Sequence, residues 1–156
     1  MIQTADLFQS GMVIQRSKPF WIWGTADAGS QITIEMDGNK CTVNADDKGY
    51  WNAELPAMEA AENIELRIYN ENDAVSYSDI AVGEVWIAGG QSNMEFHMRY
   101  EKHLALEKPI CSNSRIRFYD VPEVAYEGQE KDFDYSRMGF WRKATAADIE
   151  YFSGVG

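Results

Sequence analysis

Val85-Trp86-Ile87-Ala88-Gly89-Gly90-Gln91-Ser92-Asn93-Met94 is the stretch of sequence that decides how this chain is organised. Its first four residues form a short apolar run, which is typical of a buried strand, and two glycines end that run. Residues 93–102 contain no Gly or Pro, and two methionines among them lie four residues apart, as on one face of a helix. The pattern therefore predicts a strand, a tight glycine turn and a helix, with Ser92 at the turn.

A serine at such a turn has the position of a nucleophile. The start of a helix carries partial positive charge, which would stabilise negative charge that develops near the Ser92 hydroxyl in a transition state. The arrangement is similar to a nucleophile elbow, although the G-x-S-x-G spacing is absent because Asn93 and Met94 follow the serine. Glycine-serine turns between a strand and a helix are also common structural features. Both a catalytic and a purely structural Ser92 fit the pattern.

The segment Gly90-Gln91-Ser92-Asn93-Met94, preceded by Val82-Gly83-Glu84-Val85-Trp86-Ile87, resembles the first motif block of the sialate O-acetylesterase family. This family is a branch of the SGNH hydrolases and is related to carbohydrate acetylesterases that act on xylan. The resemblance covers essentially the whole chain, because further segments fit the family in the same order. These segments are Leu7-Phe8, Met12-Val13-Ile14-Gln15-Arg16, Trp23-Gly24, Gly49-Tyr50-Trp51, Arg115-Ile116-Arg117, Val121-Pro122 and Phe152-Ser153 to Gly156.

The resemblance implies a carbohydrate O-acetylesterase, similar to the sialate 9-O-acetylesterases, that removes acetyl groups from sugars and needs no cofactor. Ser92 would be the nucleophile, and its backbone N–H would contribute to the oxyanion hole. Gly90, Gln91 and Asn93 would support the turn and the oxyanion. The partner implied is an O-acetylated carbohydrate substrate.

In the resembled family, later blocks carry a further oxyanion residue and an Asp-x-x-His segment whose histidine is the base, and neither is found in this sequence. We therefore expect the chain to be an amino-terminal fragment of a longer esterase, with little or no activity alone. His97 is not expected to replace the base, because a helix rises ~1.5 Å per residue and places it more than a turn from Ser92. His103 is farther still.

Residues 1–82 have the pattern of a small antiparallel sandwich. In Gln31–Met36 apolar and polar side chains alternate, which places Ile32, Ile34 and Met36 on one face. Short alternating runs of this kind are separated by regular turn signals. The turns are expected at Asp37-Gly38-Asn39, Asp46-Asp47-Lys48-Gly49 and Asn70-Glu71-Asn72-Asp73, and the other strands around Phe20-Trp21-Ile22-Trp23, Cys41 to Val43, Trp51 to Leu55 and Ile64 to Ile68.

The expected fold is thus a β-sandwich, immunoglobulin-like or jelly-roll-like, over residues 1–82, followed by the start of an α/β SGNH-hydrolase domain over residues 83–156. A short strand is predicted at Ile116 to Tyr119 and a helix entry at Thr145 to Asp148. Only about two strands of the second sheet are present, whereas such sheets usually have ~4–6. The second domain is therefore expected to be truncated.

The aromatic residues of the sandwich allow two interpretations. Exposed aromatic rings form sugar-binding platforms, whereas alternating aromatics in a small sandwich more often form its core and its interface with a neighbouring domain. The second interpretation is the expectation. It concerns Phe20, Trp21, Trp23, Tyr50 and Trp51.

A net charge of −11 argues against nucleic acid or an anionic membrane surface as a partner, since phosphates would be repelled. The sequence has no apolar run that could span a bilayer and no signal-peptide pattern, so the compartment stays open between the cytoplasm and secretion, or the periplasm, after removal of a signal. Cys41 and Cys111 are expected to be free thiols, the former buried, and no metal site is expected. Glu123 to Asp134 is expected to be a solvated acidic loop.

Two other functions remain open. The chain could be a non-catalytic carbohydrate-binding β-sandwich, or a structural partner that completes the sheet of another polypeptide. Because an unfinished sheet leaves an unpaired edge and an uncovered apolar face, self-association is expected in either case.

Overall fold

The computed structural model describes residues 1–122 and 138–156. The chain divides into two compact units, Met1–Val85 and Trp86–Gly156. The first unit ends just after a long strand, β8 (Ala74–Gly83). The boundary predicted from the sequence lay between residues 82 and 83. The acidic loop expected at Glu123 to Asp134 lies outside the described residues.

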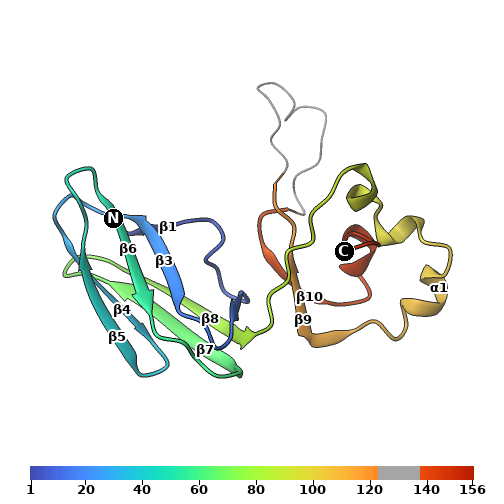
Figure 1. The fold of residues 1–156 in the computed structure, drawn as a ribbon, viewed down its shortest axis with the longest axis horizontal. Coiled ribbons are helices and arrows are strands. Elements are labelled where there is room, and N and C mark those ends of the chain that lie inside the picture. The colour runs from blue at the N-terminus through green and yellow to red at the C-terminus, as the bar shows by residue number, and fades with distance from the viewer. Residues whose placement is uncertain (123–137) are drawn as a thin grey trace. The chain divides into compact units, whose positions relative to one another are not determined.

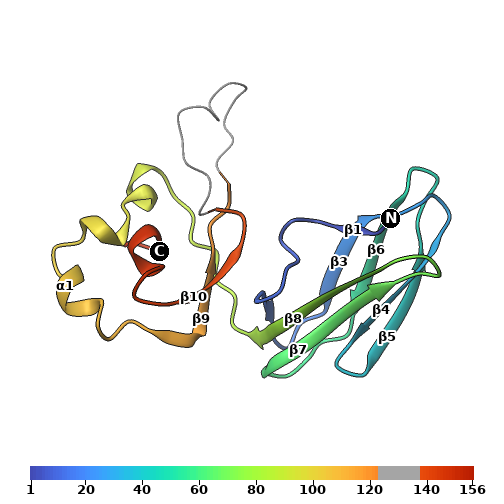
Figure 2. The same ribbon diagram turned by 180° about the vertical axis from the view of Figure 1, so that it is seen from behind.

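The first unit is a β-sandwich-like domain made of two sheets (Figure 1). One sheet has the order β1-β3-β6 and the other the order β2-β8-β7-β4-β5, whose neighbouring strands are also visible from behind (Figure 2). Besides β8, the strands are β1 (Gln3–Thr4), β2 (Val13–Gln15), β3 (Phe20–Thr25), β4 (Gln31–Met36), β5 (Asn39–Asn44), β6 (Tyr50–Leu55) and β7 (Ala61–Tyr69).

The core of this unit follows the predicted alternation. Every second residue of β4 and β6 is buried, as are Ile64, Leu66 and Ile68 of β7, and these residues are the ones that the pattern placed inward. The most deeply buried are aliphatic and come from both sheets, so burial of apolar surface from the two inner faces stabilises the sandwich. They are Ile22, Ile32, Ile34, Met36, Leu55, Leu66, Ile68 and Ile80.

The predicted hairpin between β4 and β5 is confirmed. Asp37 and Gly38 have φ angles of 47° and 75°, as a two-residue hairpin turn requires. One part of the pairing was not predicted, because β2 pairs with β8 in parallel while the other pairs of the two sheets are antiparallel. The purely antiparallel sandwich was therefore wrong at this edge, where the chain enters β2 from a loop rather than from a hairpin.

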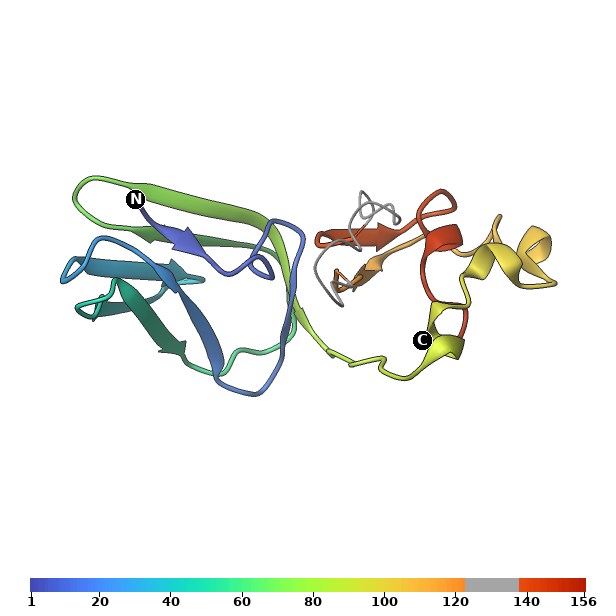
Figure 3. The same cartoon turned by 90° about the horizontal axis from the view of Figure 1, so that it is seen from above.

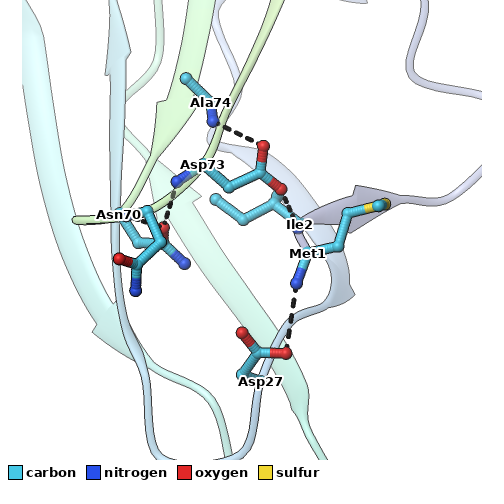
Figure 4. A network of polar contacts seen from close by, with 7 residues as sticks. Met1, Ile2, Asp27, Asn70, Asp73 and Ala74 are labelled. Atoms are coloured by element: carbon cyan, nitrogen blue, oxygen red, sulfur yellow. Dashed lines mark hydrogen bonds and ion pairs between the residues drawn. The ribbon is translucent and has the colours of Figure 1, made fainter.

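A polar network joins the amino terminus to the turn between β7 and β8 (Figure 4). The backbone N–H of Ile2 donates to Oδ2 of Asp73 at 2.6 Å, and the amino group of Met1 forms an ion pair with Asp27 at 3.2 Å. Asp73 is held by its own backbone N–H, which donates to Asn70 Oδ1 at 2.8 Å. The first residues of the chain, next to β1, are thus tied to a turn of the other sheet.

The second unit contains one antiparallel pair, β9 (Asn113–Tyr119) and β10 (Trp141–Ala144), among its described residues (Figure 3). The helices among the described residues of this unit are single turns: η1 (Ser92–Glu95), η2 (Met98–Tyr100), α1 (Leu104–Glu107) and η4 (Ile149–Tyr151). The strand predicted at Ile116 to Tyr119 lies within β9. The start of an α/β domain expected for residues 83–156 is not shown by the described residues of this unit.

Candidate functional site

The apolar run before Ser92 is not a buried strand. Trp86 is 88% exposed and Ile87 is 97% exposed, and no strand is assigned between Gly83 and Ser92. The prediction of a buried strand over residues 85–88 was therefore wrong for this structure. The physical reason is that a strand needs a neighbour for its backbone N–H and C=O groups, and none pairs with this segment in the described part of the chain.

Ser92 begins the 3₁₀ turn η1, and its side chain is exposed. The backbone N–H of Met94 donates to the carbonyl of Gln91 at 2.8 Å, which closes the turn around the serine. Gly90 packs against this turn, since a Cβ placed on it would lie 2.9 Å from Met94 Cγ. Gly90, Gln91, Ser92 and Asn93 thus form one exposed turn.

The helix predicted over residues 93–102 is absent and is replaced by the two short turns η1 and η2. Tertiary pairing is the reason. The N–H of Met98 donates to the carbonyl of Phe152 at 2.9 Å, and the N–H of Gly154 donates to the carbonyl of Phe96 at 2.7 Å. These bonds form a β-bridge at His97 and Ser153, which diverts the backbone from the helical ladder. A single turn carries little of the dipole that the sequence analysis expected at Ser92.

The carboxyl-terminal segment also holds the serine turn through side chains. Ser153 donates from its hydroxyl to the sulfur of Met94 at 3.5 Å. The same Ser153 oxygen accepts hydrogen bonds from the N–H groups of Val155 at 3.2 Å and Gly156 at 3.1 Å. Residues some sixty positions apart in the sequence therefore fix the position of Met94, which closes the turn that carries Ser92.

Neither histidine is bonded to Ser92. His97 is half-buried, stacks on Tyr100 with ring centroids 6.2 Å apart, and has a buried Nδ1 without a hydrogen-bond partner among the described residues. His103 is exposed before α1, and its backbone N–H donates to the side chain of Glu101. The Ser92 hydroxyl has no hydrogen-bond partner in residues 1–122 and 138–156.

An ion pair at the β9–β10 ladder was not anticipated from the sequence. Arg142 on β10 is the one buried charged residue within the described ranges, and its Nη2 donates to Asp120 Oδ2 at 2.5 Å. Its guanidinium also lies over the rings of Phe118, at 4.9 Å, and Phe140, at 5.3 Å. Burial raises the pKa of the Asp120 carboxyl, while Arg142 acts in the opposite direction. The strand pairing that creates this contact could not be read from local pattern.

The aromatic residues of the sandwich separate into two groups. Trp51 is 3% exposed and belongs to the core, as expected. Phe20 is half-buried, whereas Trp21, Trp23 and Tyr50 are 51%, 46% and 60% exposed, so these three do not belong to the core and the core part of the expectation was wrong for them. The reason is the strand alternation itself, because β3 directs Ile22 inward and therefore turns both tryptophans outward.

Three further observations concern the two cysteines, the grouping of metal-ligating side chains and the length of the helices. Cys41 and Cys111 are free thiols, and both are half-buried rather than fully buried. Among the described residues, no three His, Cys, Asp or Glu side chains are grouped so that they could hold a metal ion. Within the same residues, none of the helices is long and apolar enough to cross a membrane.

No protein-family model and no curated protein matches this sequence. Among solved structures, a carbohydrate acetylesterase from Xanthomonas citri matches with a TM-score of 0.88 and 29% sequence identity. The match covers 100% of this chain and 35% of that one. This chain is similar over its whole length to part of a carbohydrate acetylesterase. The similarity supports a carbohydrate esterase fold.

A second solved structure has a weaker likeness. It is the Ca²⁺-stabilised adhesin with which an Antarctic bacterium binds ice, at a TM-score of 0.34 and 18% identity over 51% of this chain and 23% of that one. At this level of similarity no conclusion about the present chain follows.

Proposed function

We propose that this chain carries the nucleophile of a serine-dependent carbohydrate O-acetylesterase, similar to the sialate O-acetylesterases of the SGNH hydrolases. The observation that carries the proposal is the whole-length similarity to a carbohydrate acetylesterase, at 29% identity. The exposed turn from Gly90 to Met94 adds the chemistry, because it presents the Ser92 hydroxyl to solvent. The chain spans 35% of the length of that acetylesterase. The activity proposed is therefore that of a larger protein.

In the proposed reaction, Ser92 Oγ attacks the carbonyl carbon of an acetyl ester on a sugar, and its proton passes to a base. The bond between the carbonyl carbon and the sugar oxygen breaks, and the sugar leaves as the alcohol after it takes up a proton. Water then attacks the acetyl-serine ester, which releases acetate and restores the hydroxyl. The reaction needs no cofactor.

Gly90, Gln91 and Asn93 would act through the geometry of the turn. The carbonyl of Gln91 closes the turn by accepting from Met94, and the small size of Gly90 lets that turn pack closely. The backbone N–H of Ser92 would then be available to a developing oxyanion, whose stabilisation is usually a large part of such catalysis.

The base is proposed to come from a segment other than these 156 residues. In the resembled family it is the histidine of an Asp-x-x-His segment, which does not occur in this sequence. A serine without a base is a poor nucleophile at neutral pH. We therefore expect the chain alone to turn over simple acetyl esters little or not at all.

The test is covalent labelling with a fluorophosphonate probe, read by intact mass and peptide mapping, without and with added imidazole as an external base. We expect little adduct without imidazole and a clear increase with it, on Ser92 alone. The Ser92→Ala variant should show no increase, and exposed Ser112 serves as an internal control site. Labelling that is equal in wild type and Ser92→Ala would refute the proposed nucleophile.

A further inference from the structure

We propose that the outer face of the sheet β1-β3-β6 binds a neutral polysaccharide chain. The residues concerned are Trp21, Trp23, Tyr50, Asn52 and Glu54, hereafter the aromatic face, and all five are exposed. They belong to the first unit, whereas Ser92 belongs to the second. The inference rests on the proposed function for the class of polymer, and it assigns to the sandwich a role apart from the serine chemistry.

The strand register places a polar partner beside each tryptophan. Trp21 lies directly opposite Glu54, and Trp23 lies directly opposite Asn52. Directly opposed side chains in an antiparallel pair have Cβ atoms about 5 Å apart, and the two tryptophans, two residues apart on β3, are separated by ~7 Å. Tyr50 lies on the diagonal from Trp23, so three rings follow one another across the face.

This combination of side chains matches the chemistry of a sugar. A pyranose ring has an apolar C–H surface, which packs on an aromatic ring, and a rim of hydroxyl groups, which hydrogen-bond to amide and carboxylate groups. Binding sites of this kind are aromatic with a few placed polar groups. β6 pairs with β3 along residues 20–25 and β1 pairs with Gly24 and Thr25, so what the outer face presents to a ligand is side chains.

Contacts with other residues hold two members of the aromatic face in place. Phe8, which is 3% exposed, meets the ring of Trp23 edge-on, with centroids 4.7 Å apart and planes at 82°. The backbone N–H of Tyr50 donates to Asp46 Oδ1 at 2.9 Å, which fixes the start of β6. Rings that are immobilised before binding lose less conformational entropy when a ligand arrives, which favours affinity.

Among carbohydrate polymers, charge disfavours the anionic ones. The chain has a net charge of −11, and Glu54 places a carboxylate on the aromatic face itself. A polyanion such as nucleic acid or polysialic acid would be repelled, whereas the hydroxyl groups of a neutral sugar can donate to that carboxylate. An uncharged polysaccharide can pack its sugar rings on the aromatic side chains and donate hydrogen bonds from its hydroxyl groups to the Glu54 carboxylate.

The test uses the full chain in affinity electrophoresis, in gels with soluble acetylated xylan, the same xylan after chemical deacetylation, or polysialic acid. We expect retardation by both xylans and none by polysialic acid. The double variant Trp21→Ala/Trp23→Ala should bind at least tenfold more weakly, while Trp21→Phe/Trp23→Phe keeps most of the retardation. Trp86→Ala, which removes an 88% exposed tryptophan outside the face, should bind as wild type does. Equal thermal unfolding of all variants would show that they fold.

Absence of retardation by either xylan, equal retardation of the double alanine variant, or an equal loss in Trp86→Ala would overturn the inference. So would a dimer, detected by light scattering, that the double alanine variant abolishes in the absence of polymer. The proposed function fails separately: if Ser92 is never labelled but deacetylated xylan still retards the chain through the two tryptophans, the aromatic face stands without the esterase. If Ser92 is labelled and the double alanine variant binds xylan as wild type does, the proposed nucleophile stands and the aromatic face is refuted.

Discussion

Gly90 and Met94 are in such close contact that a Cβ on Gly90 would lie 2.9 Å from Met94 Cγ. Real Cβ atoms essentially never come so near to another carbon, so a larger residue at position 90 forces Met94 to shift, through its side chain or together with the turn that carries Ser92. The position of the proposed nucleophile, Ser92, is therefore sensitive to the size of the residue at position 90.

We therefore expect Gly90→Ala to slow imidazole-assisted fluorophosphonate labelling of Ser92 by about 10- to 100-fold, since a displacement of about 1 Å at a reacting group can have such an effect. The neighbouring variant Gly89→Ala is the matched control, because no atom lies within 4 Å of a Cβ there. Equal labelling rates for the two variants would contradict the role given to Gly90.

The buried ion pair of the second unit should be needed for the stability of its strand pair. Arg142→Ala leaves Asp120 without its partner and exposes a gap beside Phe118, so we expect a loss of about 3 kcal/mol. Hydrogen exchange of the amides in β9 and β10 would measure the local opening free energy. Arg16→Ala, which breaks the exposed pair with Glu84, should cost its own unit much less. Similar losses at both sites would argue against the special position of Arg142.

Close packing of β1 on β3 should make Gly24 irreplaceable. A Cβ at this position would lie 1.9 Å from the backbone carbonyl oxygen of Gln3, so Gly24→Ala must push β1 away. We expect a destabilisation of about 2 kcal/mol or more in denaturant unfolding followed by the fluorescence of buried Trp51. In Gly83→Ala the nearest contact is Val13 Cγ1 at an ordinary 3.9 Å, and the loss should be much smaller.

The pKa of Glu84 is lowered by the side-chain hydrogen bond from Gln15 and then by that from Arg16. Because a lowered carboxyl pKa means that the folded chain favours the ionised form, this contribution to stability is present above the ordinary pKa of 4.5 and is lost as the pH falls through the lowered value. We expect Gln15→Ala to raise the pKa of Glu84 toward 4.5 in a carbon-detected NMR titration. An unchanged Glu84 titration in the variant would show that Gln15 has no such effect.

Local pattern was sufficient where each strand pairs with a neighbour close to it in the sequence. The alternation of Gln31–Met36 predicted β4 and its inward face, and the turn at Asp37 and Gly38 predicted its pairing with β5. These elements are determined by side-chain period and by turn residues that accept positive φ, both of which are local properties. The serine motif at Gly90 to Met94 was also visible in the sequence, and its proposed role still awaits the labelling experiment.

Local pattern failed where a distant segment competes for the backbone. Residues 93–102 have the composition of a helix, but Phe96 and Met98 bond to Phe152 and Gly154, and the helix does not form. The apolar run at Trp86 and Ile87 has the composition of a buried strand, but it stays exposed because no strand pairs with it in the described part of the chain.

The sequence by itself determined strands β3 to β7, the inward residues of β4, β6 and β7, and the serine motif, because periodicity and turn chemistry act over a few residues. Only the tertiary structure decided that Trp21 and Trp23 face outward beside Glu54 and Asn52, and that Arg142 is buried on Asp120. Those relationships depend on register and on pairing between segments far apart in the chain. No local pattern specifies them, since the free energy that selects them comes from packing of the whole unit.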